Sequence, residues 1–289
     1  MSTPRFAVSQ LTTTPWDIDQ DLETFSRLGV HIEIAEKKLS EDVVRFEAQM
    51  ARIKDSGLKI TSIQPSTLTI YPSASDPEPA GPAERADRLR TTIDRFSLHC
   101  QNVPVVTNTG ALLETGNEAE VWRGCVEYYR QLADHAAERG LKVALEALGP
   151  SLMNHSSIVY TLGQAHELVR EVDHTHFGLC LDLFNNWQDP TLADSIRDAA
   201  DKLFLVQLAD WRRPRSFHDR HALGDGEIPL ERLLNVLADV GYQGPYVLEI
   251  FSENVPESLW DDDQRLEQAI MRSRECFEWA RSKRPDSAR

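Results

Sequence analysis

The sequence predicts a single (β/α)8 barrel, a TIM barrel that spans residues 1–289. Short apolar runs alternate regularly with longer amphipathic segments along the whole chain. Glycines stand where an amphipathic segment ends and the next apolar run begins. The length of 289 residues suits one such barrel, which needs roughly 250 residues or more. The polar tail at about residues 283–289 is expected to be frayed.

The apolar runs are predicted to be the strands of the barrel, because short runs bounded by turn residues are typical of buried strands. In chain order the predicted strands are Phe6–Leu11, Val30–Ala35, Lys59–Gln64, Val103–Asn108, Lys142–Ala147, Phe177–Asp182, Leu203–Leu208 and Tyr246–Ile250. The segment Pro72–Pro82 follows the third strand and is expected to form a long loop over one face of the barrel.

The segments between and after the strands are predicted to be helices. They are Asp17–Leu28, Glu41–Asp55, Ala83–His99, Glu118–Arg139, Leu162–Val172, Thr191–Ala200, Leu230–Val240 and about Asp263–Ser282. Gly29, Gly57, Gly140 and Gly241 each follow a helix, where glycine accepts a left-handed conformation. A doubly wound open sheet is the alternative fold, but it usually carries a glycine-rich turn after its first strand, and here that turn is Thr12–Trp16.

Composition excludes several classes of partner. The formal net charge of -15 repels nucleic acids and anionic membrane surfaces. The four cysteines are scattered without metal-binding or redox spacing, so they are expected to be reduced and structural. No apolar stretch approaches the ~18 residues of a membrane span, and the N-terminus has no signal-peptide core. We therefore expect a soluble cytoplasmic protein, and a homo-oligomer is compatible with this sequence.

Four polar residues close predicted strands in the C-terminal half: Glu146, Asp182, Gln207 and Glu249. Taken singly, an acid at a strand end is usually a helix N-cap or a solvated loop residue. Together they come from four consecutive strands, whose carboxyl ends meet at one end of a barrel. Buried carboxylates need a partner, and oxygen ligands favour a hard cation. The pattern predicts one divalent metal ion, Mn²⁺ or Mg²⁺.

Several segments resemble the xylose-isomerase-like barrels, a group of sugar isomerases and epimerases. The resemblance is carried by Ala144–Glu146, Gly178–Asp182, Val206–Asp210, His221–Pro229 and Gly241–Ile250, and extends more loosely over the N-terminal half. It implies that Glu146, Asp182 and Glu249 bind the metal, and that the two glutamates are catalytic and move protons on either side of a substrate carbon. A metal that holds a carbonyl acidifies the neighbouring C–H, which a carboxylate can then deprotonate.

Two positions depart from the sugar-epimerase pattern. The strand-seven ligand is commonly His in those enzymes and is Gln207 here, and His three residues after the strand-six Asp is replaced by Asn185. A strand-seven Gln resembles the dehydratase branch, such as the 3-dehydroshikimate dehydratases. The sequence therefore leaves two functions open, a sugar isomerase or epimerase, and a lyase that acts on a keto-sugar, an inosose or a 3-dehydroshikimate-like substrate. Both reactions begin with proton removal next to a carbonyl.

Other polar residues near the predicted strand ends are candidates for binding the sugar-like substrate. They are Gln64, Asn108, His155 with its neighbour Asn154, Asn185, Arg213 and His221. Amides can hydrogen-bond hydroxyls, and one of Arg212, Arg213 and Arg215 could pair with an anionic group. Arg220 is the alternative to His221, because the loop before Gly224 and Gly226 could present either side chain. Each of the loop residues is also compatible with a solvated surface role, and at least two of the three arginines are expected to balance charge on the acidic surface.

Two further classes of function fit less well. Apurinic endonucleases share the fold, but they use a histidine-rich zinc cluster and bind phosphate, which favours positive charge. Strands three and four here end in Gln64 and Asn108, and the chain is strongly acidic. A non-catalytic binding barrel would require a degraded metal site, and Gln207 is the only residue that points to one.

Overall fold

The computed structural model describes residues 5–111, 117–153, 155–213, 219–253 and 257–283. Eight parallel strands close into a barrel in chain order, which confirms the predicted (β/α)8 fold. The strands are β1 Phe6–Ser9, β2 His31–Ala35, β3 Ile60–Gln64, β4 Pro104–Thr107, β5 Lys142–Glu146, β6 Phe177–Asp182, β7 Leu203–Leu208 and β8 Tyr246–Leu248. Because β1 pairs with both β2 and β8, the open-sheet alternative is excluded.

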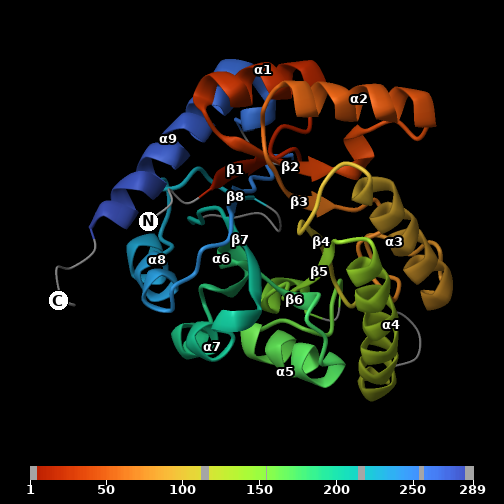
Figure 1. The fold of residues 1–289 in the computed structure, drawn as a ribbon. Helices are drawn as coiled ribbons and strands as arrows, with labels where there is room; N and C mark the ends of the chain where they lie inside the picture. The colour runs from red at the N-terminus through yellow and green to blue at the C-terminus, as the bar shows by residue number, and fades with distance from the viewer. Residues whose placement is uncertain (1–4, 112–116, 154, 214–218, 254–256, 284–289) are drawn as a thin grey trace.

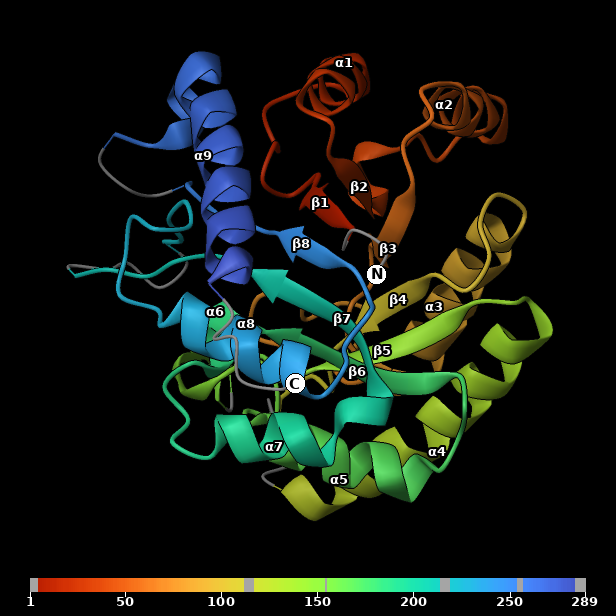
Figure 2. The same ribbon diagram turned by 60° about the vertical axis from the view of Figure 1, so that its left-hand side comes forward.

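The helices form a ring outside the strands (Figure 1). They are α1 Ile18–Leu28, α2 Val43–Asp55, α3 Pro82–Ser97, α4 Glu118–Glu138, α5 Leu162–Val172, α6 Leu183–Asn186, α7 Leu192–Asp198, α8 Leu230–Asp239 and α9 Asp263–Ser282. In both views α9 lies beside α1, so the last helix closes the ring against the first (Figure 2). Among the helices that the structure describes, none combines the length and apolarity that crossing a membrane requires.

Local sequence signals explain where the helices begin and end. The side chain of Asp17 accepts a hydrogen bond from the backbone of Gln20 at the start of α1, and Thr161 and Gln164 form a capping box at α5. The four predicted stop glycines have φ angles of 63°, 75°, 70° and 75°, which confirms their left-handed conformation; they are Gly29, Gly57, Gly140 and Gly241.

Six of the eight strands, β1 and β8 among them, are one or two residues shorter than predicted, and one short α-helix was missed. β1 ends at Ser9 and β8 at Leu248 because the Thr12 hydroxyl donates to the Leu248 carbonyl and accepts from Ile250 N–H, which replaces the sheet pairing there. The missed helix is α6, which follows β6 directly. Its N-cap is Asp182, whose side chain accepts from Phe184 N–H at 2.8 Å.

The core has an outer and an inner part. Outside the barrel, helices bury apolar stripes against the strands, as α8 does with Leu230, Leu233, Leu234 and Leu237. Burying one such leucine contributes roughly 1.5–3 kcal/mol. Inside the barrel lies a smaller cluster of Ala7, Val106, Ala144, Cys180, Leu205 and Val247. Toward the C-terminal ends of the strands the interior becomes polar, which is where barrel enzymes carry their active sites.

The long loop between β3 and α3 is held by a fully buried arginine, Arg85. Its guanidinium donates to the Thr69 carbonyl at 2.9 Å, to the Asp76 carboxylate at 2.7 Å and to the Pro79 carbonyl at 3.1 Å. The same loop donates from Ala74 N–H to the carbonyl of His155, beyond β5. The predicted Pro72–Pro82 loop therefore crosses the same end of the barrel as the strand-end carboxylates.

We expect Arg85→Met to lower the free energy of unfolding by about 3 kcal/mol or more, because the loop acceptors would stay buried without a donor. Arg88→Met is the matched control. Arg88 lies on the same helix with its side chain 54% exposed, and its pair with Glu84 is worth at most about 0.5 kcal/mol. Urea denaturation measures both. Equal losses in the two variants would contradict the structural role of Arg85.

Candidate active site

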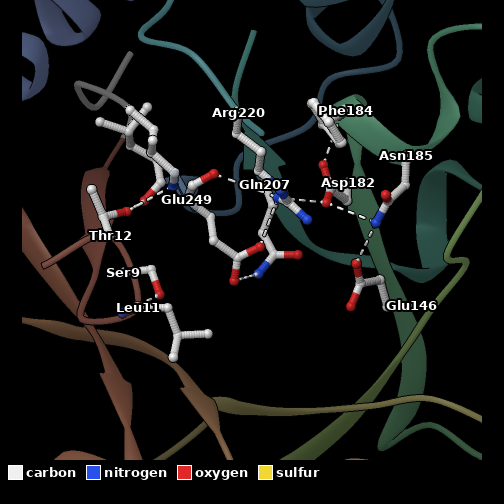
Figure 3. A network of polar contacts seen from close by, with 12 residues as sticks. Ser9, Leu11, Thr12, Glu146, Asp182, Phe184, Asn185, Gln207, Arg220 and Glu249 are labelled. Carbon is white, nitrogen blue, oxygen red and sulfur yellow. Dashed lines mark hydrogen bonds and ion pairs between the residues drawn. The ribbon is translucent and has the colours of Figure 1, made fainter. Parts of the chain in front are cut away.

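The four strand-end residues lie together at the C-terminal mouth of the barrel (Figure 3). Glu146 ends β5, Asp182 ends β6, Gln207 lies in β7 and Glu249 follows β8. Asp182 pairs in register with Gln207, so their side chains start from the same level of the barrel. The most exposed of the four is Glu146, at 6%. These groups are therefore withdrawn from water and must be satisfied by one another and by their neighbours.

Asparagine amides hold Glu146 in place. Asn185 Nδ2 donates to Glu146 Oε1 and to Asp182 Oδ2, both at 2.9 Å, and thus bridges the two carboxylates. Asn108 Nδ2 donates to Glu146 Oε2 at 3.3 Å. Both asparagines were predicted as substrate ligands, and the structure brings both into contact with the carboxylate cluster.

A buried arginine bridges the other pair of carboxylates. Arg220 Nη1 lies 2.9 Å from Asp182 Oδ2 and 2.8 Å from Glu249 Oε2 (Figure 3). Its guanidinium also lies over the rings of Phe184 and Phe251, 4.7 and 4.6 Å from their centroids. The arginine is 5% exposed, so its contacts with the carboxylates are largely unscreened by water.

Arg220 is positioned by a loop that folds around Asp210. The Asp210 carboxylate accepts backbone N–H bonds from Trp211, Gly224, Gly226 and Ile228 at 2.8–3.0 Å. A Cβ at Gly226 would lie 2.4 Å from Asp210 Oδ1, so the loop needs glycine there. The backbones of Asp210 and His221 pair, while the His221 ring lies 3.2 Å from the Asp219 carboxylate. Of the two alternatives in the sequence, Arg220 is the residue that contacts the carboxylate cluster.

Glu33 is a fourth buried carboxylate of this cluster, and sequence reasoning missed it. It lies within β2, is 0% exposed, and its Oε2 accepts from the Ser62 hydroxyl at 2.5 Å. Gln64 Nε2 lies 3.4 Å from Glu33 Oε1 and 3.3 Å from Glu249 Oε1, so it connects the two acids. A glutamate within an apolar run was a signal that could have identified it, because a strand interior does not tolerate a lone carboxylate.

Burial raises the pKa of each carboxyl group in the cluster. Burial and the neighbouring charge of Asp182 raise the pKa of Glu146 to about 8. Burial also raises the pKa of Asp182, Glu249 and Glu33, while Arg220 partly offsets this for Asp182 and Glu249. The pKa of Arg220 is raised, because the nearby carboxylates outweigh the effect of its own burial. The site thus contains more buried carboxyl groups than one guanidinium could neutralise if all of them were ionised.

The donor set fits a divalent cation in charge and in ligand type. The carboxylates at the mouth, when ionised, outnumber the positive groups beside them. Their oxygen atoms are the ligands that a hard cation prefers. Among the described residues, however, no three His, Cys, Asp or Glu side chains form a ready-made metal site. Arg220 lies between Asp182 and Glu249, and Gln207 Nε2 donates to Glu249 Oε1 at 3.1 Å while its oxygen accepts from the Cys180 thiol. A cation would have to compete with these contacts.

The remaining predicted residues lie away from the cluster or outside the described chain. His155 is exposed, and its Nδ1 lies 2.9 Å from the Ser156 hydroxyl. Arg213 is exposed, with its guanidinium 5.9 Å from the centroid of the Trp211 ring. Asn154 and Arg215 lie outside the described residues. Both side chains are exposed, in contrast to the buried carboxylates of the cluster.

A known protein family and a solved structure both match this chain over most of its length. A family model described as a xylose isomerase-like TIM barrel matches residues 29–276. A solved structure of the IolI protein with a binding zinc atom superposes with a TM-score of 0.77 at 20% identity, covering 98% of this chain and 99% of that one. At this level of identity the superposition supports the fold alone.

Curated relatives match at higher identity over shorter segments. An inosose isomerase of Halalkalibacterium halodurans is 32% identical over 52% of this chain and 51% of its own length. A 3-dehydroshikimate dehydratase of Pseudomonas putida is 31% identical over 58% of this chain and 27% of its own length. A ketose 3-epimerase of Arthrobacter globiformis is 26% identical over 47% of this chain and 48% of its own length. The matches thus span about half or less of each relative.

The raised pKa of Glu146 makes stability depend on pH. Between the ordinary carboxyl value of 4.5 and about 8, folded Glu146 keeps a proton that the unfolded chain releases. Stability that is present below pH 4.5 is therefore lost as the pH rises through about 8, by up to about 1.4 kcal/mol per pH unit for one proton. We expect Glu146→Gln to remove this part of the decline in chelator-treated protein. Urea denaturation across the window measures it, with exposed Glu120→Gln as control; parallel curves for all three proteins would contradict the prediction.

Proposed function

Because the chain belongs to the xylose isomerase-like TIM-barrel family, we propose that it is a metal-dependent enzyme that isomerises or epimerises a sugar-like substrate. The relatives named as inosose isomerase and ketose 3-epimerase support this reaction class. Their matched segments cover about half of each relative, so the activity is inferred from the site as well as from the likeness. The proposed chemistry is proton removal from a carbon next to a carbonyl.

One observation carries the proposal: two buried glutamates lie at the two ends of a connected polar network. Contacts run from Glu249 through Arg220 to Asp182, and through Asn185 to Glu146 (Figure 3). Burial raises the pKa of both glutamates, to about 8 for Glu146. A carboxyl group with a pKa near neutrality can both accept and return a proton, as general acid–base catalysis requires. Two buried carboxyl groups at opposite ends of the network suit proton transfer on two sides of a substrate carbon.

The residues proposed to hold the divalent cation, Mn²⁺ or Mg²⁺, are Glu146, Asp182, Gln207 and Glu249. When bound, the cation would polarise the substrate carbonyl and acidify the neighbouring C–H. The zinc atom bound by the IolI protein supports a metal in this fold, and the excess of buried carboxylates supports one here. We assign proton transfer to the glutamates and not to Asp182. Both oxygens of Asp182 already accept hydrogen bonds, from Phe184 N–H, Asn185 and Arg220.

The chain also offers a hydrogen-bond donor to a substrate oxygen. Within the described residues Arg220 Nε is buried and has no hydrogen-bond partner. A buried N–H without an acceptor is costly, so a substrate hydroxyl or carbonyl oxygen that reaches Nε would gain a charge-assisted hydrogen bond. Asn108 and Asn185 keep their amide oxygens for substrate hydroxyls, because their Nδ2 groups already hold Glu146.

A lyase is the second candidate, and a particular residue favours it. Gln207 supplies a neutral amide that cannot titrate, so proton handling at the site falls to the glutamates. If one glutamate removes the proton and none returns it to the opposite face, loss of a β-hydroxyl as water follows naturally. The 31% identical match to a 3-dehydroshikimate dehydratase supports this class.

We expect Glu146→Gln and Glu249→Gln each to lower kcat by about 100-fold or more, since an amide cannot accept the substrate proton. Circular dichroism and the thermal midpoint check that both variants stay folded. Exposed Glu231→Gln on α8 is the control and should keep wild-type kcat. Near-normal turnover in both buried variants would remove the proposed role of the cluster.

Turnover in D₂O with Mn²⁺ separates the two reaction classes. We expect an inosose or a ketose to gain deuterium next to the carbonyl while all hydroxyls are retained, as NMR and mass spectrometry can measure. For the lyase, 3-dehydroshikimate would instead lose water and gain the absorbance of a new conjugated double bond. Deuterium gain with intact hydroxyls would exclude the lyase, and water loss without exchange would exclude the epimerase.

A further inference from the structure

Glu33 is a buried carboxylate that the proposed chemistry does not use. It projects from β2 into the barrel interior and is 0% exposed. Ser62 donates to its Oε2 at 2.5 Å, and Gln64 Nε2 lies 3.4 Å from its Oε1. These partners are a hydroxyl and an amide, so Glu33 is held by neutral donors. A buried acid that only accepts hydrogen bonds constrains the direction in which such donors point.

Gln64 connects Glu33 to Glu249. Gln64 Nε2 lies between Glu33 Oε1, at 3.4 Å, and Glu249 Oε1, at 3.3 Å. Gln207 Nε2 donates to the same Glu249 Oε1 at 3.1 Å. The NH₂ group of Gln64 therefore lies between two carboxylates, and it has the two N–H bonds that this position requires.

The two carboxylates determine which end of the Gln64 amide faces them. A carboxylate only accepts hydrogen bonds, whereas a primary amide has a donating NH₂ end and an accepting oxygen end. With Glu33 on one side and Glu249 on the other, the NH₂ end of Gln64 must face both acids. Gln207 turns its NH₂ end toward Glu249, and its oxygen accepts from the Cys180 thiol at 3.2 Å. Without Glu33, one carboxylate in place of two would hold the Gln64 amide.

We propose that Glu33 is a positioning residue that orients the amide of Gln64, and through it fixes Oε1 of Glu249. The other oxygen of Glu249 is held by Arg220 at 2.8 Å, so Glu33 completes the orientation of the proposed base. Glu33 acts through Gln64 and does not itself contact the reacting atoms. The inference rests on the proposed function for its effect on catalysis, but the amide orientation can be tested separately.

The test compares Glu33→Gln with a matched control, Glu36→Gln. Glu36 is a second buried glutamate just after β2, and it accepts from Ser66 N–H and from the Thr92 hydroxyl, both at 2.8 Å, outside the barrel. In Glu33→Gln the charged acceptor opposite the Gln64 NH₂ group becomes a neutral amide with one accepting oxygen, so the hydrogen bond that orients Gln64 is weakened. Loss of such a supporting contact typically costs about 10- to 100-fold in metal affinity or activity.

We expect Glu33→Gln to lower kcat and the Mn²⁺ affinity of the metal-free protein by about 10-fold or more, with a much smaller change in KM. Isothermal titration with Mn²⁺ alone measures the affinity. The side-chain NH₂ signals of Gln64 in ¹H–¹⁵N NMR spectra should shift in Glu33→Gln. All three quantities should stay near wild type in Glu36→Gln, even if its stability falls.

Unchanged NH₂ signals, Mn²⁺ affinity and kcat in a folded Glu33→Gln would overturn the proposal, as would equal losses in Glu36→Gln. If Glu33→Gln does not fold, Gln64→Met removes one bridge and leaves Glu33 in place. It should lower Mn²⁺ affinity and kcat in the same direction, and wild-type values in that variant would also overturn the proposal. Failure of the proposed function has a different signature, namely a wild-type protein that neither binds Mn²⁺ nor turns over, and in that case the NMR signals decide the role of Glu33.

Discussion

The burial of several carboxylates in one small volume is the constraint on which the rest of the site depends. The acids are Glu33, Glu146, Asp182 and Glu249. Ionised acids at such short range repel one another and lose hydration, so each must be given N–H donors or stay protonated. Nitrogen donors lie between neighbouring acids along the network. Asn185 bridges Glu146 and Asp182, Arg220 bridges Asp182 and Glu249, and Gln64 bridges Glu249 and Glu33. The remaining negative charge favours binding of a cation.

The barrel supplies the short distances, and loops supply the compensating groups. Consecutive parallel strands carry the acids to one end, since their C-terminal ends point the same way. Arg220 instead comes from a loop after β7, where four backbone N–H groups converge on Asp210. The buried Asp210 carboxylate thus fixes the shape of the loop, and that shape places the Arg220 guanidinium beside Asp182 and Glu249. The strands therefore position the acids, while the loop supplies the positive charge that partly balances them.

The reaction class depends on how few titratable groups the site contains. The strand-seven position is an amide, Gln207, and the position three residues after Asp182 is Asn185. Neither can take a proton from a substrate, so only carboxyl groups can exchange protons there. Their raised pKa values follow from burial, which the barrel interior imposes. A site with two such acids and neutral neighbours is compatible with two-sided proton transfer, and also with one-sided removal followed by elimination.

The sequence by itself determined the strand order, the barrel and the strand-end acids, because buried parallel strands appear as apolar runs and any polar residue closing them stands out. Strand and helix ends were less certain, since side chains such as Thr12 can replace sheet bonds locally. Only the tertiary structure decided that Glu33 joins the cluster, that Arg220 rather than His221 contacts it, and that Gln207 turns its nitrogen toward Glu249. These outcomes depend on distances between segments far apart in the chain, which exist only once the barrel closes and the loops pack across its mouth.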